Sequence, residues 1–393
     1  MEILFLSPWC PYPADNGSKL RIFHLLRGLS NRHTLDLIAF CPDAPIPQAS
    51  QELRQFCRSV SLLPETPFAG RRLGRAVGLL SAQPRSMAGN FSSAMAALVE
   101  QTISQRRYSA LVCAQLHMLP YALRTYDVPI IFEELELAML ADTACSGRLR
   151  ASMTWWKTRH YVAVSMRRCA GATVVSATEE HLARQIAPPG IPLAVVPNGV
   201  DTAELAGNFG SPEPNTLIYP GALSYDANHD AMAYFLNAIF PLIRHECPNV
   251  RLRVTGRATS AQIATLPNIE GVEFTGYLDD VRPAVARSWV EVVPLRKGGG
   301  TRLKVLEALA LGTPVISTSK GVEGLALQPG RDVLVADTPA DFAAQTLRLL
   351  RFPALRADMA AHGRRTVASY DWSQSIARLE DLIAQAVGAE SHV

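Results

Sequence analysis

Short apolar runs alternate with helix-like patterns along the whole chain. The runs are continuous rather than alternating, which is typical of parallel strands covered on both faces. Between them, apolar residues recur at the three- and four-residue spacing of one helix face, as Ile22, Leu25, Leu26 and Leu29 do after the first run. The pattern predicts strands at residues 3–6, 35–40, 60–63, 110–113, 129–132, 172–175, 194–196, 216–219, 251–255, 272–275, 290–293, 314–317 and 333–335.

The strand-and-helix order repeats in two halves, which predicts two doubly wound α/β domains. A chain of 393 residues also exceeds what one hydrophobic core usually organises. Pro, Gly and Asn cluster without periodicity at residues 197–214, so we expect the junction there. We therefore assign residues 1–200 to the first domain, residues 201–374 to the second, and residues 375–393 to a C-terminal helix.

Composition narrows the function classes. The net charge is only +3, so there is no electrostatic footprint for a nucleic-acid partner. The seven cysteines are odd in number and form no CxxC pair, which argues against a disulfide framework or a zinc cluster and favours the reducing cytoplasm. The start, MEILFLSPW, reads as a strand rather than a signal peptide. No apolar stretch reaches the roughly 18 residues that span a membrane.

An anion-binding loop is predicted in the segment PLRKGGGTRLKVLEALALGTPVIS at residues 294–317. A strand ends at its start, and the glycines at residues 298–300 precede a helix expected to begin near Thr301. Glycines let backbone N–H groups approach an anion closely, and the helix N-terminus adds a partial positive charge. Gly312 suits the left-handed position that ends a helix.

Lys304 and Glu307 lie three residues apart on this helix and therefore share a face. That face offers a cation for a phosphate and a carboxylate for sugar hydroxyls. The alternative is a solvent-exposed Lys–Glu pair after an ordinary glycine loop. The glycine loop and the helix start together favour the functional interpretation.

Polar residues also follow the first-domain strands, at the edge where a doubly wound sheet binds ligands. Gly17 and Lys19 lie between the first strand and the first helix, and His117 follows the strand at residues 110–113. Glu134 and Glu136 follow the next strand. Each has an ordinary alternative: a turn before a helix, a structural histidine, or solvated loop charges.

Basic and aromatic residues are concentrated at residues 148–168, which include Trp155, Trp156 and Tyr161. Arg71, Arg72 and Arg75 form a second basic cluster beside apolar residues. A basic amphipathic helix can lie on an anionic membrane surface, so peripheral association with the inner face of the cell membrane is one expectation. A solvated helix face is the other.

Four segments together resemble the family 4 glycosyltransferases of GT-B fold, along nearly the whole chain. They are VVPNGVD at residues 195–201, TGYLDDVRPAVARSWVEVVPL at residues 275–295, the glycine loop and helix through LEALALGTPVIS, and SYDWS at residues 369–373. The resemblance implies two Rossmann-like domains that face each other across a cleft. It also implies that the C-terminal helix packs back on the first domain.

The resemblance further implies a nucleotide-diphosphate-sugar donor, held mainly by the second domain. Glu307 matches the glutamate that binds the ribose, and Gly299, Gly300 and Thr301 match the loop that cradles the sugar and phosphate. Lys304 is the cation expected at the leaving diphosphate, with Arg302 as the second candidate. Further donor contacts are implied for Gly17, Gly256, Arg257, Tyr277 and Leu278, and His117 matches a catalytic-site histidine that meets the acceptor or the transferred sugar. From their place at the strand ends, rather than from the resemblance, we expect acceptor-side contacts for Lys19, Glu134 and Glu136.

Two departures from the family pattern affect the donor site. Gly299 stands where the family often has a glutamate, and the loop GALSYDANHD at residues 221–230 lacks the usual basic pair. A subset with SYxxN at this loop and GGGTRLK later is the closer match.

The implied reaction is sugar transfer with retention of anomeric configuration to a saccharide, lipid-linked or other hydroxyl acceptor, in surface polysaccharide or glycoconjugate synthesis. No clustered carboxylates suggest a metal site, so we expect no cofactor and no metal requirement. The alternatives are a nucleotide-sugar epimerase on the same scaffold and a non-catalytic protein that binds sugar nucleotides.

Overall fold

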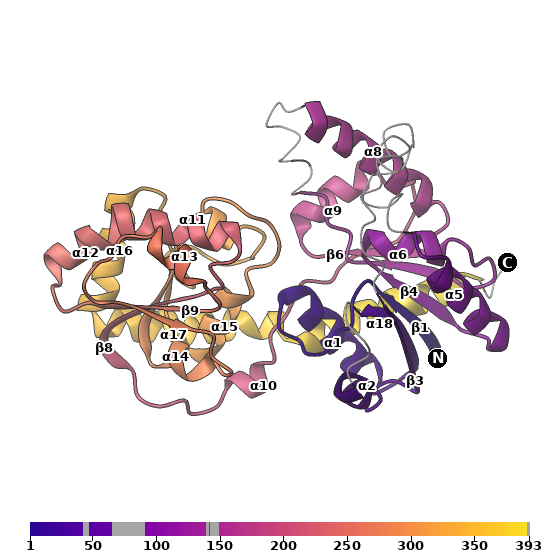
Figure 1. Ribbon diagram of the computed structural model, residues 1–393, viewed down its shortest axis with the longest axis horizontal. Coiled ribbons are helices and arrows are strands. Elements are labelled where there is room, and N and C mark those ends of the chain that lie inside the picture. The colour runs from indigo at the N-terminus through magenta and orange to yellow at the C-terminus, as the bar shows by residue number, and fades with distance from the viewer. Residues whose placement is uncertain (42–46, 65–90, 139–140, 142–148, 391–393) are drawn as a thin grey trace. The chain divides into compact units, whose positions relative to one another are not determined.

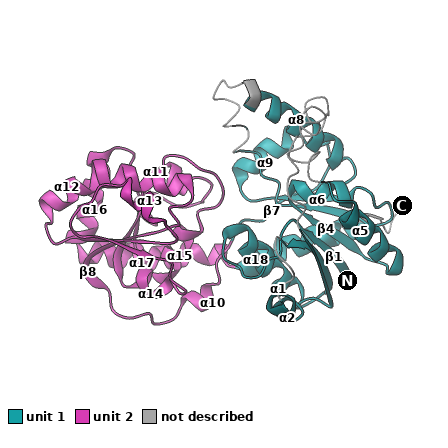
Figure 2. Cartoon of the chain, in the orientation of Figure 1, with its two compact units in different colours: residues 1–198, 372–393 teal, residues 199–371 magenta. Residues whose placement is uncertain are grey.

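The computed structural model describes residues 1–41, 47–64, 91–138, 141 and 149–390 (Figure 1). The chain divides into two compact units (Figure 2). Unit 1 comprises Met1–Asn198 and Trp372–Val393, and unit 2 comprises Gly199–Asp371. The chain thus leaves unit 1 after Asn198 and returns to it at Trp372, whereas the sequence analysis placed these borders after residues 200 and 374.

Unit 1 contains a seven-stranded parallel sheet in the order β3-β2-β1-β4-β5-β6-β7. Its strands are β1 (Glu2–Ser7), β2 (Thr34–Cys41), β3 (Ser59–Pro64), β4 (Ala110–Ala114), β5 (Ile130–Glu133), β6 (Gly171–Val174) and β7 (Leu193–Val195). Among its described residues, the helices are α1 (Gly17–Leu29), α2 (Pro47–Leu53), α5 (Ser93–Gln105), α6 (Gln115–Ala122), α8 (Leu149–Met166), α9 (Ala177–Arg184) and α18 (Trp372–Glu390).

Alternate residues of β1 show how helices cover both faces of this sheet. Ile3 and Phe5 belong to a buried cluster that includes residues of α1 and α18. Leu4 and Leu6 belong to a second cluster, with residues of α5, α6, α8 and α9. Because both faces are buried, the strands read as continuous apolar runs, and each strand predicted from the sequence overlaps an observed one.

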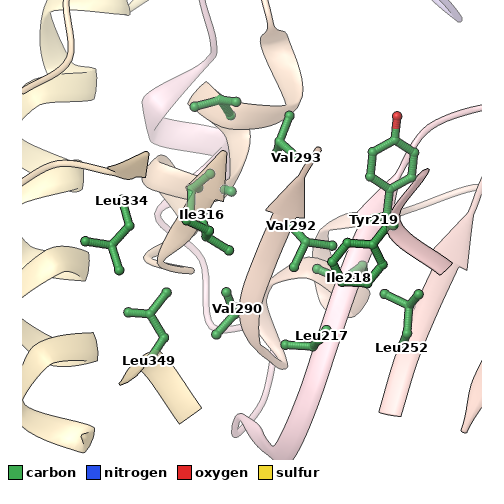
Figure 3. Packing of buried hydrophobic residues seen from close by; sticks show 14 of the residues in the cluster. Leu217, Ile218, Tyr219, Leu252, Val290, Val292, Val293, Ile316, Leu334 and Leu349 are labelled. Carbon is green, nitrogen blue, oxygen red and sulfur yellow. The ribbon is translucent and has the colours of Figure 1, made fainter. Parts of the chain in front are cut away.

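Unit 2 contains a six-stranded parallel sheet in the order β10-β9-β8-β11-β12-β13. Its strands are β8 (Glu213–Pro220), β9 (Arg251–Thr255), β10 (Val272–Gly276), β11 (Ser288–Val293), β12 (Val315–Ser317) and β13 (Leu334–Val335). Its α-helices are α10 (Thr202–Leu205), α11 (Asp226–Tyr234), α12 (Phe240–Glu246), α13 (Ser260–Ala264), α14 (Arg282–Ala286), α15 (Leu303–Leu311), α16 (Pro339–Arg351) and α17 (Pro353–Val367). Figure 3 shows core residues from five of these strands, with Leu349 of α16.

The C-terminal helix α18 lies against unit 1, although the whole of unit 2 precedes it in the chain. Two glycines allow it to approach closely. A Cβ atom added at Gly28 of α1 would lie 2.0 Å from Cδ1 of Ile376, and one added at Gly171 of β6 would lie 2.9 Å from Cδ1 of Leu382. A side chain at either glycine would require the Ile376 or Leu382 side chain of α18, or the helix itself, to move. Among the described residues, no helix is both long and apolar enough to cross a membrane.

The six strands of the unit 2 sheet have the same order as the first six strands of unit 1, to which β7 is added at one edge. The first strand of each unit, β1 or β8, lies between the second and the fourth strands of that unit. From β1 the chain crosses to β2 and β3 on one side, whereas from β4 it crosses to β5 and β6 on the other side. The order of the strands therefore reverses between β1 and β4, and in the same way between β8 and β11. In open parallel sheets, ligands bind outside the carboxyl ends of the strands at such a point, so each unit has one edge at which a site is expected.

Candidate functional site

In unit 2, the loops that follow β8 and β9 touch at the expected edge. Gly256, directly after β9, has φ +111°, and a Cβ atom there would lie 2.7 Å from the backbone nitrogen of Ala222. At Gly221, directly after β8, a Cβ atom would lie 2.7 Å from Nζ of Lys304. Glycine at these two positions lets the two loops and a lysine side chain meet at one point.

Lys304 is the cation at this point. It lies in the first turn of α15, and its Nζ donates a 3.3 Å hydrogen bond to Oδ1 of Asn228. The ammonium lies 4.0 Å from the centroid of the Tyr219 ring, whose hydroxyl donates to the same Oδ1 at 2.7 Å. Burial lowers the pKa of Lys304 to about 8, although the neighbouring carboxyl of Glu291 raises it.

Asn228 is the asparagine of the SYxxN pattern and a residue that the sequence analysis did not single out. Besides accepting the two hydrogen bonds from Lys304 and Tyr219, it donates one of 2.9 Å from Nδ2 to the carbonyl of Ala222. One amide thus fixes the loop after β8 and the lysine of α15 together. The loop carries no cation of its own, and Lys304 supplies one from another element.

Arg302 has a different environment from Lys304. It is the N-cap residue of α15, so the helix begins at Leu303 rather than near Thr301 as expected. Its buried guanidinium donates to the carbonyls of Gly299 at 2.5 Å and Gly298 at 2.8 Å. These contacts favour a bracing role for Arg302 in the glycine loop.

Two ion pairs connect the start of the glycine loop to the first residues of α11. Lys297 forms an ion pair with Asp226 at 2.6 Å, and Arg296 forms one with Asp230 at 2.8 Å. At Gly300, which has φ +81°, an added Cβ atom would meet no atom within 4 Å. The start of the loop, at Arg296 and Lys297, is therefore held by ion pairs. The backbone at Gly300, between Gly299 and Thr301, has space beside it.

Three of the remaining second-domain candidates lie on the loops after β9 and β10, and the fourth, Glu307, lies on α15. The guanidinium of Arg257 lies 4.9 Å from the centroid of the Tyr277 ring, and both side chains are exposed. Leu278 follows and is half-buried. Glu307 lies one turn along α15 from Lys304 and is also half-buried, and burial raises its pKa. These residues share the strand edge at which Lys304 lies.

At the unit 1 edge, Asn16 and Gly17 form the start of α1. The Asn16 side chain caps the helix by accepting from the backbone N–H of Lys19 at 3.1 Å, and Lys19 forms an ion pair with Asp15 at 3.0 Å. Gly17 is thus the first residue of the helix. His117 lies in the first turn of α6 with its side chain exposed.

Arg21 is the unit 1 residue that the sequence analysis missed. It is fully buried, and its Nε and Nη2 donate to Oε1 of Glu133 at 2.8 Å and 2.5 Å. Its Nη1 donates to Oδ1 of Asn198 at 2.9 Å. Asn198 belongs to the junction motif and is the last residue before the chain enters unit 2. The signal available in the sequence was a charged residue beside the apolar face of α1.

Glu134 is fixed in place rather than solvated. Both Glu134 and Gln115 have positive φ angles, of 61° and 58°, which non-glycine residues rarely adopt. Nε2 of Gln115 donates to Oε2 of Glu134 at 2.8 Å. Burial raises the pKa of Glu134 to about 8, although Arg21 lowers it. Strained backbone of this kind is concentrated at functional sites. Glu136, in contrast, is exposed.

The described residues contain no group of three or more His, Cys, Asp or Glu side chains that could hold a metal ion. The basic cluster Arg71, Arg72 and Arg75 lies outside the described residues, and so does Arg148. Most of the other basic stretch forms α8.

Comparison with known proteins gives the class of this site. Residues 214–351, which lie within unit 2, match the family described as glycosyl transferases group 1. A phosphatidyl-myo-inositol mannosyltransferase of Mycolicibacterium smegmatis is 29% identical over 205 residues, which are 49% of this chain and 52% of that protein. The chain thus matches about half the length of this relative.

Solved structures resemble the whole chain. Anabaena Alr3699/HepE, solved in complex with UDP and glucose, has a TM-score of 0.65 and 14% identity, with all of both chains covered. WaaG, a glycosyltransferase involved in lipopolysaccharide biosynthesis, has a TM-score of 0.63 and 14% identity, covering 97% of this chain and 99% of WaaG. The fold is therefore GT-B. Together with the family match in unit 2, it supports a glycosyltransferase.

The buried pair of Arg21 and Glu133 generates a stability prediction. Arg21→Met should lower the free energy of unfolding by about 3–5 kcal/mol, because it leaves the Glu133 carboxyl buried without its partner. The double variant Arg21→Met, Glu133→Leu should recover most of that loss, since it removes both charges. Chemical denaturation compares the unaltered protein, the single variants Arg21→Met and Glu133→Leu, and the double variant. A double variant as unstable as the sum of the two single variants would contradict this account of the pair.

Proposed function

We propose that this chain is a retaining glycosyltransferase that moves a sugar from a nucleoside-diphosphate donor to a hydroxyl of an acceptor. The observation that carries the proposal is the position of Lys304. Its ammonium lies at the β8/β11 edge, in the first turn of α15 and after the glycine loop. A helix N-terminus, open glycine backbone and a fixed cation are the groups that bind a diphosphate.

The same groups suit the chemistry of transfer. When the bond between sugar and diphosphate breaks, negative charge grows on the departing diphosphate. A cation that is already held in place stabilises that charge without reorganising. In this proposal Lys304 acts on the diphosphate, Arg302 shapes the glycine loop, Glu307 binds the ribose, and Arg257 and Tyr277 flank the base. No metal ion is required.

Unit 1 is proposed to contact the acceptor. His117 is an exposed side chain near the β4 end, and the Glu134–Gln115 pair lies at the ends of β5 and β4. These groups offer hydrogen bonds to sugar hydroxyls. The names of the similar proteins, which refer to phosphatidyl-myo-inositol and lipopolysaccharide, favour a lipid-linked or saccharide acceptor in surface glycoconjugate synthesis.

A transfer assay tests the function. The protein is incubated with labelled nucleotide sugars, with and without a cell lipid extract, and with excess EDTA. Label should move to an acceptor, and EDTA should leave the rate unchanged because Lys304 and the helix N-terminus replace a metal ion. An isomerised donor without acceptor would indicate an epimerase, and donor binding without turnover a non-catalytic protein. Loss of activity in EDTA that Mg²⁺ or Mn²⁺ restores would refute the metal-free mechanism.

Three substitutions should separate three roles. Lys304→Ala should lower kcat about 100-fold, since the cation binds the charged transition state better than the ground state.

Glu307→Ala should raise KM for the donor, because the ribose does not change during the reaction. His117→Ala should lower turnover but leave nucleotide affinity nearly unchanged. Melting curves first establish that each variant is folded. An unaltered kcat for Lys304→Ala would remove this lysine from the mechanism.

Membrane association is proposed for α8. On this helix the Trp156 ring is 61% exposed and stacks on His160, while Met153 and Val164 are also exposed. The protein should co-sediment with anionic vesicles at low salt and be released as salt rises, because exposed charges are screened. Trp156→Ala should weaken this binding. Equal binding to neutral vesicles would contradict an electrostatic contribution from α8.

A further inference from the structure

Asn228 of α11 uses both ends of its amide at the β8 edge of unit 2. Its Nδ2 donates to the carbonyl of Ala222, in the loop after β8, at 2.9 Å. That carbonyl can only accept a hydrogen bond, so it determines which end of the amide is the nitrogen. Oδ1 is the other end, and it accepts from the Tyr219 hydroxyl at 2.7 Å and from Nζ of Lys304 at 3.3 Å. The loop thus sets the orientation of the oxygen that holds the ammonium.

The same arrangement confines the ammonium of Lys304. The centroid of the Tyr219 ring lies 4.0 Å from Nζ. An added Cβ atom at Gly221 would lie 2.7 Å from Nζ and 3.0 Å from Nδ2 of Asn228. A lysine side chain has many rotamers, and it loses that freedom when it binds an anion. Here the side chain is already ordered before a ligand binds, which favours binding.

Both groups that hold the ammonium are uncharged. An amide oxygen and an aromatic face attract a cation, yet neither neutralises it. Aspartate has nearly the shape of asparagine, but its carboxylate at position 228 would take the place of an oxygen that lies 3.3 Å from Nζ, which is ion-pair distance. It would also lack the donor to Ala222. An amide therefore suits both contacts, because it orders the ammonium and leaves the positive charge available to an anion.

We propose that Asn228 is a positioning residue for the binding of a nucleoside diphosphate, and that its neutral amide orders the Lys304 ammonium without cancelling the charge. Asn228 acts through Lys304 rather than by contact with the ligand. The inference rests on the proposed function in that unit 2 binds a nucleoside diphosphate at Lys304. An asparagine that only tied Ala222 to α11 would stabilise the loop, and its effect on binding would not depend on the lysine.

Diphosphate affinity, measured by calorimetry at pH 7, tests the role of the amide. The probes are UDP, GDP and ADP, of which the tightest binder is used. Asn228→Ala should weaken binding about 10-fold, because the ammonium is no longer ordered. Asn228→Asp should weaken it by a further ~10-fold, because the carboxylate cancels the positive charge and repels the diphosphate. An Asn228→Asp protein that binds as tightly as Asn228→Ala, or more tightly, would overturn the role of the neutral amide.

Asn237→Asp is the matched control. The Asn237 side chain is exposed, and its Nδ2 donates to the carbonyl of Ala233 at 2.7 Å. The substitution therefore also adds a negative charge and removes a donor to a backbone carbonyl. Asn237 comes nine positions after Asn228, about 13 Å further along the same helical segment. Diphosphate affinity should be unaltered, and a fall as large as that of Asn228→Asp would overturn the proposal.

A double-mutant cycle with Lys304→Met shows whether Asn228 acts through the lysine. In the Lys304→Met background, Asn228→Ala should change diphosphate affinity by no more than ~2-fold, because no ammonium remains to be ordered. Ligand-observed NMR measures the weak binding that is expected in this background. Full additivity of the two changes would overturn the proposal and leave Asn228 with a structural role.

Melting curves establish that each variant is folded. If Asn228→Asp does not fold, the cycle still decides, because it uses Asn228→Ala. Failure of every diphosphate to bind the unaltered protein would count against the proposed function itself. Normal binding by the unaltered protein, with additive effects in the cycle, would count against the role of Asn228 alone.

Discussion

Parallel pairing of the strands is the constraint on which both units depend. All strands of a parallel sheet end at the same edge, and each connection must cross back over one face. In such sheets a ligand crevice is expected where the crossings diverge, which is at β1/β4 in unit 1 and at β8/β11 in unit 2. The groups described at the two edges therefore come from loops and helix starts that follow different strands. Arg21 and Lys304 are both in helices that directly follow a strand of such a pair.

Arg21 and Lys304 are held by different kinds of partner: a carboxylate for Arg21, and an amide oxygen and an aromatic ring for Lys304. Arg21 is fully buried and is neutralised by direct hydrogen bonds to Glu133, which suits a fixed structural charge. Lys304 is only half-buried, and it contacts the neutral oxygen of Asn228 and the ring of Tyr219 rather than a carboxylate. Its charge is thus positioned but not cancelled, and remains able to act on an anion.

The sequence was sufficient for the strands and the glycine loop because their signals are local. Continuous apolar runs mark strands buried on both faces, and Gly312, with φ +80°, ends α15 where the pattern predicted. The hydrogen bonds of Arg21 and the full burial of Glu291 could not be predicted in this way. Arg21 meets Glu133 across 112 positions of chain, and no periodicity reports such a pairing. Glu291 interrupts an apolar run, and the run alone does not show that its side chain is fully buried.

The cation that the segment after β8 lacks is supplied by a residue far along the chain, Lys304 of α15. The loop at residues 221–230 contains no Lys or Arg, yet its first residue, Gly221, leaves room for Nζ of Lys304. Any side chain at position 221 would displace the ammonium, so the glycine and the lysine depend on each other. Asn228 then ties the loop to the lysine, because its Nδ2 donates to the carbonyl of Ala222 and its Oδ1 accepts from Lys304. If the segment at residues 221–230 is considered by itself, the positive charge expected after β8 is missing. The fold supplies that charge from α15, 76 positions further along the chain.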